Sequence, residues 1–395
     1  MKILMLAPDF GYGGAERSFA STCNLLATEH EVTCVLFNRD KEAAYSLDVP
    51  VYWLDPPTPI KGSMSRFWHR VRTLRRLKRE LEIDVCVSFL EGADYVNVAS
   101  GGVTVASIRG SKFHDRNIAG LMGVVRRSLL MPLAYRRFSH VVCVSGALLV
   151  EMRDGLGVRS DRVSVLNNFY DFDLLASQAT RDLSPGLAAA FQDNEVLSAV
   201  GRLDLPKNFE NLVRIYARVA KARKQTRLAI VGDGHLGDAI LGVAAEEGLS
   251  VAEYDEATDS LDTSAGLWLL GYHPVPVSVV ARSRLLLVPS RWEGFPNVVI
   301  EGIAAGAWTL VADCPSGPRE ILLPEVGLDE VLDLPQAGEA GELLPIPVDD
   351  ATIDAWATRI LDCLSNPPAA PGAGAISRYS PAAAMAFWRD LLAKF

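Results

Sequence analysis

Two glutamates flank a loop that could bind a polyhydroxylated ligand. An apolar run at 285–288 indicates a buried strand of a parallel sheet, and Gly294 and Pro296 after it indicate a loop followed by a helix start. Amide groups at a helix start suit an anion or sugar hydroxyls. Glu293 and Glu301 lie on either side of that start, so they could reach separate parts of one ligand. An ordinary strand–helix connection with two solvated glutamates fits the same spacing.

Two cations, Arg202 and Lys207, follow another predicted strand at 196–200. Arginine offers a planar fork and lysine a point charge, a combination that suits a diphosphate. Standing alone, they would be better interpreted as solvated surface cations. Glycine turns, Gly232-Asp233-Gly234 and Gly271-Tyr272, follow the next two strands. Because cations, turns and glutamates all follow strands of one domain, a nucleotide-sugar site at the carboxyl edge of its sheet is favoured.

A further glycine pair, Gly13-Gly14, lies between a predicted strand at 2–6 and a helical pattern that starts near Ala15. Such a pair lets the backbone approach a phosphate or a sugar closely. It does not match the G-x-G-x-x-G dinucleotide fingerprint, and no acidic residue is evident about 20 positions later. A nicotinamide-dependent oxidoreductase is therefore disfavoured, and a glycine turn without a ligand explains the pair by itself.

Strand-length apolar runs alternate with helix-length stretches along the whole chain, which indicates parallel α/β sheets. The chain of 395 residues is too long for one ordinary core. The sequence predicts two Rossmann-like domains facing each other across a cleft, with a boundary near Pro185-Gly186. We expect a first domain at 1–180, a second at 190–380 and a C-terminal helix at about 381–395 that could pack back on the first domain or against the second. The strand-like runs are 2–6, 32–37, 84–90, 103–108, 141–144, 163–166, 196–200, 228–231, 267–270, 285–288 and 308–312.

The composition excludes several classes of protein. A net charge of -9 argues against a general nucleic-acid binder. The six cysteines lack C-x-x-C spacing, and three of them interrupt strand-like runs, so a disulfide framework or a zinc site is not expected. The apolar run at 3–7 is too short for a signal peptide, and no run is long enough to cross a bilayer. We expect a cytoplasmic protein whose contact with a membrane, if any, is peripheral.

A strongly basic segment at 61–81 stands out against this negative average. It carries eight cations between Lys61 and Arg79, with apolar residues at near-helical spacing and no acid among them. Such an amphipathic basic helix fits an anionic membrane surface or a pyrophosphate-bearing lipid. A helix packed on the core with a solvated charged face is the alternative.

The chain resembles a retaining glycosyltransferase of family 4, with the GT-B fold. The paired glutamates Glu293 and Glu301 with seven residues between them, together with Arg202 and Lys207, carry the specific part of the resemblance, and the glycine turns add to it. A further run, Cys314-Pro315-Ser316-Gly317-Pro318-Arg319-Glu320-Ile321, is similar to members that extend lipid-linked or surface polysaccharides. The implied reaction moves a hexosyl or N-acetylhexosaminyl group from a nucleotide sugar, expected to be a UDP-sugar, to a glycan or polyprenyl-linked acceptor.

The resemblance also implies roles for individual residues. Arg202 and Lys207 would bind the donor diphosphate and neutralise its charge as it leaves. Glu293 would lie beside the donor sugar, and Glu301 would hold the ribose hydroxyls. Gly14 would approach the diphosphate from the first domain. Backbone amides of Gly294, Phe295, Pro296, Asn297 and Val298 would face sugar and phosphate, and Gly271 and Tyr272 would lie near the base.

Such enzymes need no metal bound to a D-x-D motif, so the resemblance implies no cofactor and no metal site. Asp171-Phe172-Asp173 looks like that motif, but no other metal ligands lie near it in sequence. Many members carry a histidine after a strand of the first domain, whereas this chain has Arg109 there and His114 farther along the loop. Either residue could serve the acceptor side.

Alternative functions remain open at the level of sequence. A nucleotide-sugar epimerase or a phosphorylase could use the same fold, because fold does not determine function. A two-lobed sugar-binding protein without catalysis is a further alternative. It would not need the Arg202 and Lys207 pair, and it would usually be exported.

Overall fold

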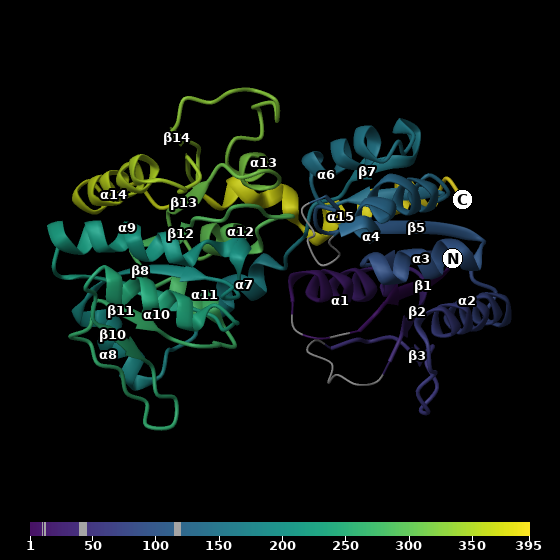
Figure 1. Cartoon of the computed structure of the whole chain (residues 1–395), viewed down its shortest axis with the longest axis horizontal. Coiled ribbons are helices and arrows are strands. Elements are labelled where there is room, and N and C mark those ends of the chain that lie inside the picture. Colours follow the sequence, from purple (N-terminus) through teal and green to yellow (C-terminus); the bar gives the residue numbers. More distant parts are fainter. Residues whose placement is uncertain (10, 12, 39–45, 114–119) are drawn as a thin grey trace. The chain divides into compact units, whose positions relative to one another are not determined.

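A computed structural model describes the chain except for residues 10, 12, 39–45 and 114–119 (Figure 1). The described residues form two compact units. Unit 1 consists of Met1–Phe169 and Tyr379–Phe395, and unit 2 consists of Tyr170–Arg378. The division lies after Phe169, at the start of the segment 168–194 in which the sequence places the boundary, so residues 170–180, which the prediction gave to the first domain, are part of unit 2.

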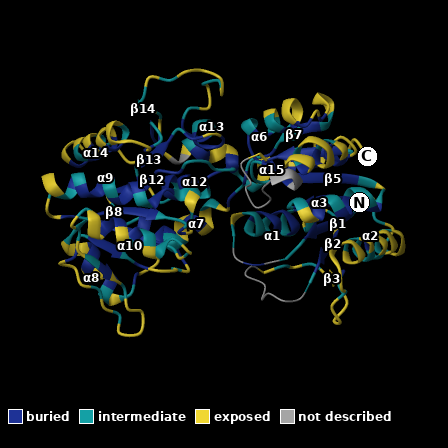
Figure 2. Cartoon of the chain, viewed as in Figure 1, coloured by how far each residue is buried: buried dark blue, intermediate teal, exposed yellow. Residues whose placement is uncertain are grey.

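Unit 1 contains a sheet of seven parallel strands in the order β3-β2-β1-β4-β5-β6-β7. The central strand β1 aligns Leu4 with Thr33 on one side and with Cys86 on the other. Nearly every residue of the central strands is buried, as expected for a parallel sheet covered by helices on both faces (Figure 2). The strands are β1 (Lys2–Ala7), β2 (Glu31–Leu36), β3 (Val51–Trp53), β4 (Val85–Phe89), β5 (Val103–Ile108), β6 (His140–Cys143) and β7 (Val163–Val165).

The C-terminal helix of the chain packs in unit 1, against α1. Trp388, Leu391 and Leu392 of this helix belong to the same buried cluster as Phe19 of α1. The helices of unit 1 are α1 (Gly14–Ala27), α2 (Ser63–Glu80), α3 (Glu91–Ser100), α4 (Gly120–Val125), the π-helix η1 (Arg126–Leu130), α5 (Met131–Tyr135), α6 (Gly146–Val150), the π-helix η2 (Glu151–Gly155), the 3-10 turn η3 (Ser160–Arg162) and α15 (Pro381–Leu392).

Unit 2 contains a sheet of eight strands in the order β10-β11-β9-β8-β12-β13-β15-β14, of which only the edge strand β14 runs antiparallel. The central pairing aligns Leu285 of β12 with Leu197 of β8. The strands are β8 (Glu195–Val200), β9 (Thr226–Val231), β10 (Val251–Glu253), β11 (Leu267–Leu269), β12 (Leu285–Val288), β13 (Thr309–Ala312), β14 (Gln336–Ala337) and β15 (Gly341–Leu344).

Helices cover both faces of this second sheet. Trp356 of α14 is fully buried beside Leu197 and Leu310, and Trp268 of β11 is fully buried in a separate cluster with Phe191. The helices of unit 2 are α7 (Phe172–Ala179), α8 (Pro185–Asp193), the 3-10 turn η4 (Leu205–Lys207), α9 (Phe209–Ala222), α10 (Gly237–Glu246), α11 (Pro276–Val280), α12 (Asn297–Ala304), α13 (Pro318–Leu322), α14 (Asp350–Ser365) and the 3-10 segment η5 (Ala373–Tyr379), whose last residue is assigned to unit 1.

The predicted fold class is confirmed: each unit is a Rossmann-like α/β layer structure built on a parallel or nearly parallel sheet. In each sheet the strand order reverses beside the first strand, between β1 and β4 in unit 1 and between β8 and β12 in unit 2. Ligands of open α/β sheets bind at the carboxyl ends of the strands on either side of that reversal. Within the described part of the chain, no helix has the length and apolar character needed to cross a membrane.

Candidate active site

The carboxyl ends of β8 and β12 bring two of the predicted motifs together in unit 2. The loop after β8 carries Arg202 and Lys207, and the loop after β12 carries Glu293. The backbone amide of Arg291 donates to the carbonyl of Pro206 at 2.8 Å, so the two loops are joined directly. Asn208, in the left-handed conformation at φ 58°, donates its side-chain amide to the carbonyl of Pro289 at 3.1 Å. These contacts fix the relative positions of the two loops.

Lys207 and Glu293 form an ion pair at the reversal of the strand order. Lys207 Nζ lies 2.7 Å from Glu293 Oε1, and Ser290 Oγ donates to the same oxygen at 2.7 Å. The two side chains are 22% and 11% exposed. Burial favours the neutral amine, but the carboxylate of Glu293 outweighs it, and the pKa of Lys207 is raised above its usual value. The lysine is therefore positively charged in the folded protein at neutral pH.

Arg202 is held much less tightly than Lys207. Its side chain is 74% exposed, and Nε donates to Asp204 Oδ2 at 2.7 Å. Nε is its only donor that binds a described residue, which leaves the terminal nitrogens of the guanidinium available to a ligand. The other oxygen of Asp204, Oδ1, is buried and has no hydrogen-bond partner among the described residues.

The glycine turns hold the ends of neighbouring strands together. Gly201 donates its amide to Val231 at 3.0 Å, and Gly232 donates to Gly271 at 2.8 Å. Gly232 has φ 144°, and a Cβ there would lie 1.9 Å from the carbonyl oxygen of Gly201. No other residue fits this close approach. Tyr272 directly follows Gly271, after the carboxyl end of β11, and its side chain is exposed.

Glu301 is buried on α12, one helical turn after Asn297. Asn297 accepts a hydrogen bond from the hydroxyl of Tyr170 at 2.5 Å. The side chains of Phe295 and Val298 point into the protein, so these residues can offer only their backbone to a ligand. Pro296 precedes the helix as its N-cap residue and has no N–H group. The prediction of an amide donor at Pro296 is therefore wrong.

Three residues of this site were given no role from the sequence. Ser290 and Asn208 fix Glu293 and the loop around it, and Ser316 donates its hydroxyl to the backbone carbonyl of Glu293. Asn208 directly follows Lys207, and Ser290 lies three residues before Glu293, so short polar residues in these two loops were the available signal. Ser316 lies on the loop after β13, and nothing in the local sequence links it to Glu293.

In unit 1, Arg109 extends from the carboxyl end of β5. Its Nε donates to Ser107 Oγ at 3.0 Å, and Nη1 donates to Asn168 Oδ1 at 3.0 Å. Its guanidinium carbon lies 4.7 Å from the ring centre of Phe89. His114 lies outside the described residues. Gly14 is the first residue of α1, which follows β1 at the reversal of this sheet.

Asp171 serves as a helix cap. Its side chain accepts from the backbone amide of Leu174 at 3.0 Å, and Asp173 lies in the first turn of the same helix, α7. Both positions are favoured for aspartate by the orphan amides and the dipole of a helix start. The start of helix α7 therefore explains why two aspartates occur at this spacing.

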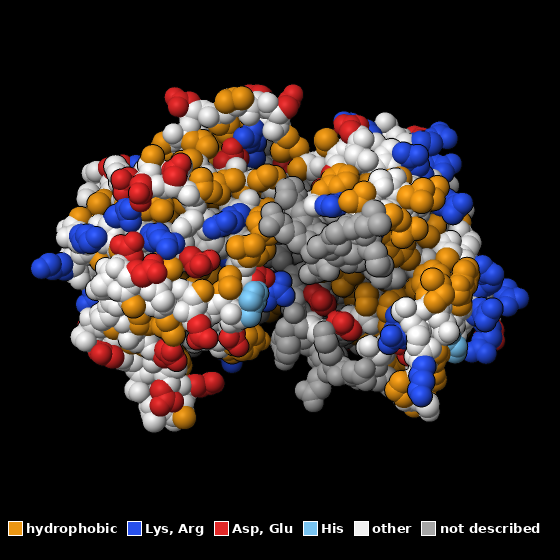
Figure 3. Space-filling model, viewed as in Figure 1, with side chains coloured by type: hydrophobic (Ala, Val, Ile, Leu, Met, Phe, Trp, Pro, Cys, Tyr) orange, Lys and Arg blue, Asp and Glu red, His pale blue; other side chains and the backbone are white. Residues whose placement is uncertain are grey.

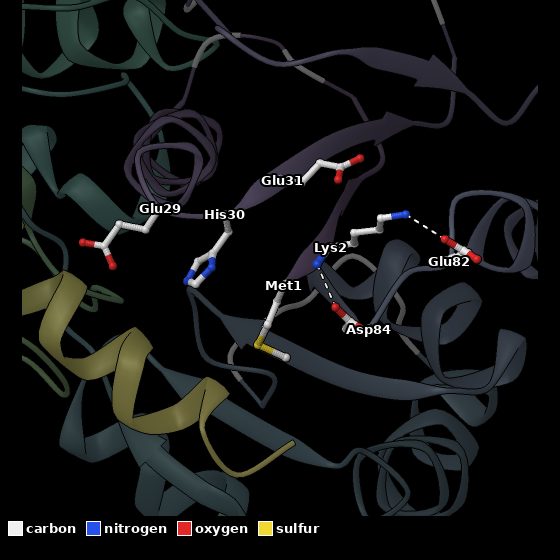
Figure 4. Close-up of a pocket in the computed structure, with 7 residues that line it drawn as sticks. All are labelled: Met1, Lys2, Glu29, His30, Glu31, Glu82 and Asp84. Carbon is white, nitrogen blue, oxygen red and sulfur yellow. Dashed lines mark hydrogen bonds and ion pairs between the residues drawn. The ribbon is translucent and has the colours of Figure 1, made fainter.

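A cavity of about 360 Å³ in unit 1 lies at the opposite edge of its sheet from the expected ligand edge (Figure 4). It surrounds the amino ends of β1 and β2 and contains four carboxylates and His30. Lys2 already binds two of these carboxylates, Glu82 through Nζ at 2.9 Å and Asp84 through its backbone amide at 2.8 Å. Since parallel sheets bind ligands at their carboxyl edge, this cavity is not the candidate site.

Two family models match the chain. The model described as Glycosyltransferase Family 4 matches residues 12–174, and the model described as Glycosyl transferases group 1 matches residues 187–332. The first match falls in unit 1 apart from its last five residues, and the second falls in unit 2 and includes Arg202, Lys207, Glu293 and Glu301.

Curated relatives include two glycosyltransferases. The N-acetylgalactosamine-N,N'-diacetylbacillosaminyl-diphospho-undecaprenol 4-alpha-N-acetylgalactosaminyltransferase of Campylobacter jejuni is 27% identical over 322 residues, which are 79% of this chain and 80% of that protein. An uncharacterised glycosyltransferase of Methanocaldococcus jannaschii is 29% identical over 183 residues, 46% of this chain. The chain spans 42% of the archaeal protein.

Solved structures share the fold over the full length. Anabaena HepE in complex with UDP and glucose matches with a TM-score of 0.74 at 18% identity, and the match covers 100% of both chains. The apo form of the lipopolysaccharide outer core galactosyltransferase WaaB matches with a TM-score of 0.67 at 18% identity, again over 100% of both chains. The two family models together cover most of the chain, and the fold agrees with them: the chain is a glycosyltransferase similar to family 4, with the GT-B fold.

Proposed function

We propose that this glycosyltransferase moves a hexosyl or N-acetylhexosaminyl group from a UDP-sugar to a lipid-linked glycan, with retention of configuration at the anomeric carbon. The observation that carries this proposal is the Lys207–Glu293 pair with Arg202 beside it, at the reversal of the strand order in unit 2. A site for a nucleotide sugar needs cations for the diphosphate and an acceptor for sugar hydroxyls, and this edge supplies both.

The two cations would neutralise the diphosphate as it leaves. The terminal nitrogens of Arg202 bind no described residue, so its fork suits a bidentate contact with phosphate oxygens. Lys207 uses one N–H on Glu293 and keeps two others for the ligand. Stabilising the charge that develops on the leaving group is the largest electrostatic demand of this reaction.

Glu293 would bind the donor sugar through its second oxygen. Oε1 accepts from both Lys207 and Ser290, whereas Oε2 has no partner among the described residues. A carboxylate fixed on one side in this way can accept a hydroxyl of the sugar on the other. Glu301 would bind the ribose hydroxyls, and Gly271 and Tyr272 would lie near the base. The two glutamates thus hold different parts of the donor and are not an acid/base couple.

Several relatives support the choice of substrates. HepE has been solved with UDP and with UDP-glucose, which favours a UDP-sugar here. Two relatives from Campylobacter jejuni are named for the transfer of N-acetylgalactosamine to acceptors on diphospho-undecaprenol, which favours a polyprenyl-linked acceptor. Retention of configuration and the absence of a metal requirement are proposed from the resemblance to family 4. A location at the cytoplasmic face of the membrane is proposed from the short apolar run at 3–7 and from the lipid-linked acceptors of the relatives.

The test is a panel of UDP-glucose, UDP-N-acetylglucosamine and UDP-N-acetylgalactosamine, measured with EDTA present. We expect one of them to raise the melting temperature and to be consumed when a polyprenyl-diphosphate-linked sugar is added, with an α-linked product visible by NMR. Stabilisation only after Mg²⁺ or Mn²⁺ is added would refute metal-free binding. Conversion of the donor without an acceptor into another nucleotide sugar would identify an epimerase.

A lipid-linked acceptor requires contact with a membrane, and unit 1 offers a surface for it. Arg75 and Lys78 of α2 are not part of that surface, because they donate to the last carbonyls of α3, Ser100 and Gly101. These two contacts stabilise the end of a helix, as cations do there. The exposed cations and large apolar residues that remain on α2 and just before it are Lys61, Met64, Arg66, Trp68, Arg72, Arg76 and Arg79. The exposed Glu80 at the end of α2 pairs with Arg76 at 3.7 Å.

The segment formed by α4, η1 and α5 adds an exposed apolar face. Val125, Leu129 and Leu133 are all more than 40% exposed, and this segment contains no acidic residue. Helices α2 and α5 both contact α3, so the two surfaces lie next to the same helix. Figure 3 shows hydrophobic side chains gathered over the α4 region of unit 1 and cations at its edge beside α2. This combination suits an anionic bilayer.

Vesicles that contain phosphatidylglycerol test this surface. We expect the variant with Arg72 and Arg79 changed to Gln to bind such vesicles more weakly than the wild type. The matched control changes Arg153 and Arg159, two exposed arginines of the same unit that pair with neighbouring aspartates. Equal loss in both variants would show a general charge effect and would refute a defined surface.

A further inference from the structure

The loop after β13 reaches back to the loop that carries Glu293. Ser316 is buried and donates its hydroxyl to the backbone carbonyl of Glu293, 23 residues earlier in the chain. Gly317 packs beside the same loop, since a Cβ on it would lie 2.5 Å from Cδ of Pro296 and 3.1 Å from Cα of Phe295. Two consecutive residues thus contact the predicted donor loop, one by a hydrogen bond and one by close packing.

Both residues have a left-handed backbone. Ser316 has φ 70° and Gly317 has φ 92°. A glycine adopts this conformation readily, whereas a serine does so at a cost in stability. A glycine at position 316 would avoid that cost, so the serine is explained by its hydroxyl and not by the turn.

The turn around Ser316 is itself fixed to the sheet. Arg319 pairs with Asp313 at 2.5 Å across the turn, and its Nη1 donates to the carbonyl of Gly327 at 3.0 Å. Asp313 follows β13 directly, and its amide donates to Leu344 of the next strand at 2.8 Å. The hydroxyl of Ser316 therefore extends from a rigid support rather than from a mobile loop.

We infer that Ser316 is a positioning residue: through the backbone of Glu293 it sets where the Glu293 carboxylate lies for the donor sugar. Lys207 and Ser290 fix one oxygen of that carboxylate, and Ser316 fixes the main chain from which the side chain extends. This inference rests on the proposed function, in which Glu293 contacts the donor. It also gives a role to the Cys314–Ile321 run, which the proposed function leaves unassigned.

The experiment compares Ser316→Ala with Ser316→Gly. Both variants lose the hydroxyl, but only the alanine variant keeps the unfavourable backbone, so their stabilities should differ while their activities agree. For the UDP-sugar that the wild type consumes fastest among UDP-glucose, UDP-N-acetylglucosamine and UDP-N-acetylgalactosamine, we expect kcat to fall about tenfold in both, the effect of one lost hydrogen bond. KM for the donor should change far less.

Three results would overturn the inference. If Ser316→Gly had wild-type kcat and only Ser316→Ala were slow, the serine would act through the backbone alone. If both were as fast as the wild type while Glu293→Gln was slow, Ser316 would have no part in positioning. If Glu293→Gln itself retained full activity, the proposed role of Glu293 would fail, and the inference would fail with it for a distinguishable reason.

Discussion

Arg202 and Lys207 lie at the same edge of the sheet but differ in how exposed and how firmly fixed their side chains are. Lys207 is nearly buried and fixed by Glu293, so its position is set before any ligand arrives. Arg202 is exposed and bound at one nitrogen only. A long exposed side chain loses rotamer entropy when it binds, so the two cations should contribute differently to ligand binding and to folding stability.

The first prediction concerns Arg202. We expect Arg202→Ala to lower UDP-sugar consumption at least a hundredfold, because a cation on the leaving diphosphate is removed. Its melting temperature should fall by only a few degrees, since the arginine is 74% exposed although its partner Asp204 is only 13% exposed. Arg159→Ala is the matched control, as Arg159 pairs with Asp161 at the same sequence spacing far along the chain from these loops. Comparable loss of activity in the control would contradict the assignment.

The second prediction concerns Asp94, a fully buried carboxyl group of unit 1. Ser88 Oγ and Tyr135 Oη both donate to it at 2.8 Å, yet burial dominates and raises its pKa to about 6. A carboxyl group whose folded pKa lies above its unfolded value stabilises the protein at low pH, and this contribution is lost as the pH rises through about 6.

The stability of the wild type relative to Asp94→Asn should therefore fall by about 2 kcal/mol between pH 4 and pH 7. Urea unfolding of both proteins at several pH values measures this difference. The variant matches the wild type in size and cannot ionise at position 94, so titrating groups that do not interact with Asp94 cancel in the comparison. Lys112, whose Nζ lies 3.9 Å from Asp94 Oδ2, is present in both proteins. A difference that stays constant over this range would show that Asp94 titrates near its ordinary value.

At the scale of elements, apolar runs in the sequence predicted most strands of the two sheets. The runs at 103–108 and 285–288 match β5 and β12 in both bounds, and the basic helix at 61–81 corresponds to α2. Four short strands were not predicted: β3, β10, β14 and β15. Strand β15 contains the charged residue Glu342, so it does not look like an apolar run. Glu342 is buried and forms an ion pair with Arg359, 17 residues later, and no local sequence pattern reveals that pairing.

Only part of the candidate site could be predicted, because some of its contacts join residues that are far apart in the sequence. Residues at the ends of long apolar strands, such as Lys207 and Glu293, can be found because strand order brings carboxyl ends to one edge. Ser316 could not be found, since its contact with Glu293 depends on the shape of a turn between β13 and α13. Contacts that depend on the conformation of a loop, and not on the order of the strands, cannot be predicted from the sequence pattern.

The third prediction tests the turn at Gly317. Gly317→Ala would place a Cβ against Pro296, so we expect the donor loop to shift and the UDP-induced rise in melting temperature to shrink strongly. Gly306→Ala is the matched control. Gly306 also has a left-handed backbone, at φ 79°, but a Cβ there meets nothing within 4 Å.

Both alanine variants should lose about 1–2 kcal/mol of stability from backbone strain. Only Gly317→Ala should lose UDP binding beyond that. Equal UDP binding in the two variants would show that the turn does not support the donor loop.

At the scale of the whole molecule, each unit has its own sheet and its own buried clusters. The clusters differ in how they are assembled. Those of unit 2 draw on one continuous segment, whereas a cluster of unit 1 includes residues of α15 from the other end of the chain.

The fourth prediction concerns this last helix. Trp388 is fully buried among residues of unit 1, so Trp388→Ala should cost about 3–5 kcal/mol of stability. Trp68→Ala, at an exposed site on α2, is the control and should cost much less. Hydrogen exchange should become faster in β1, β2 and β4 while β8, β9 and β12 keep their protection. Faster exchange in unit 2 instead would contradict the assignment of α15 to unit 1.

The path of the chain through its two units also bears on synthesis. Domains commonly complete their folds in the order in which the ribosome makes them. Here unit 2 ends at Arg378, while α15, which fills the core of unit 1, is made only after all of unit 2. Synthesis of unit 1 therefore starts first, but its core is completed second. A nascent chain that ends before residue 381 contains all of unit 2 and a unit 1 that lacks α15. The apolar surface that α15 would cover is then exposed and available to a chaperone.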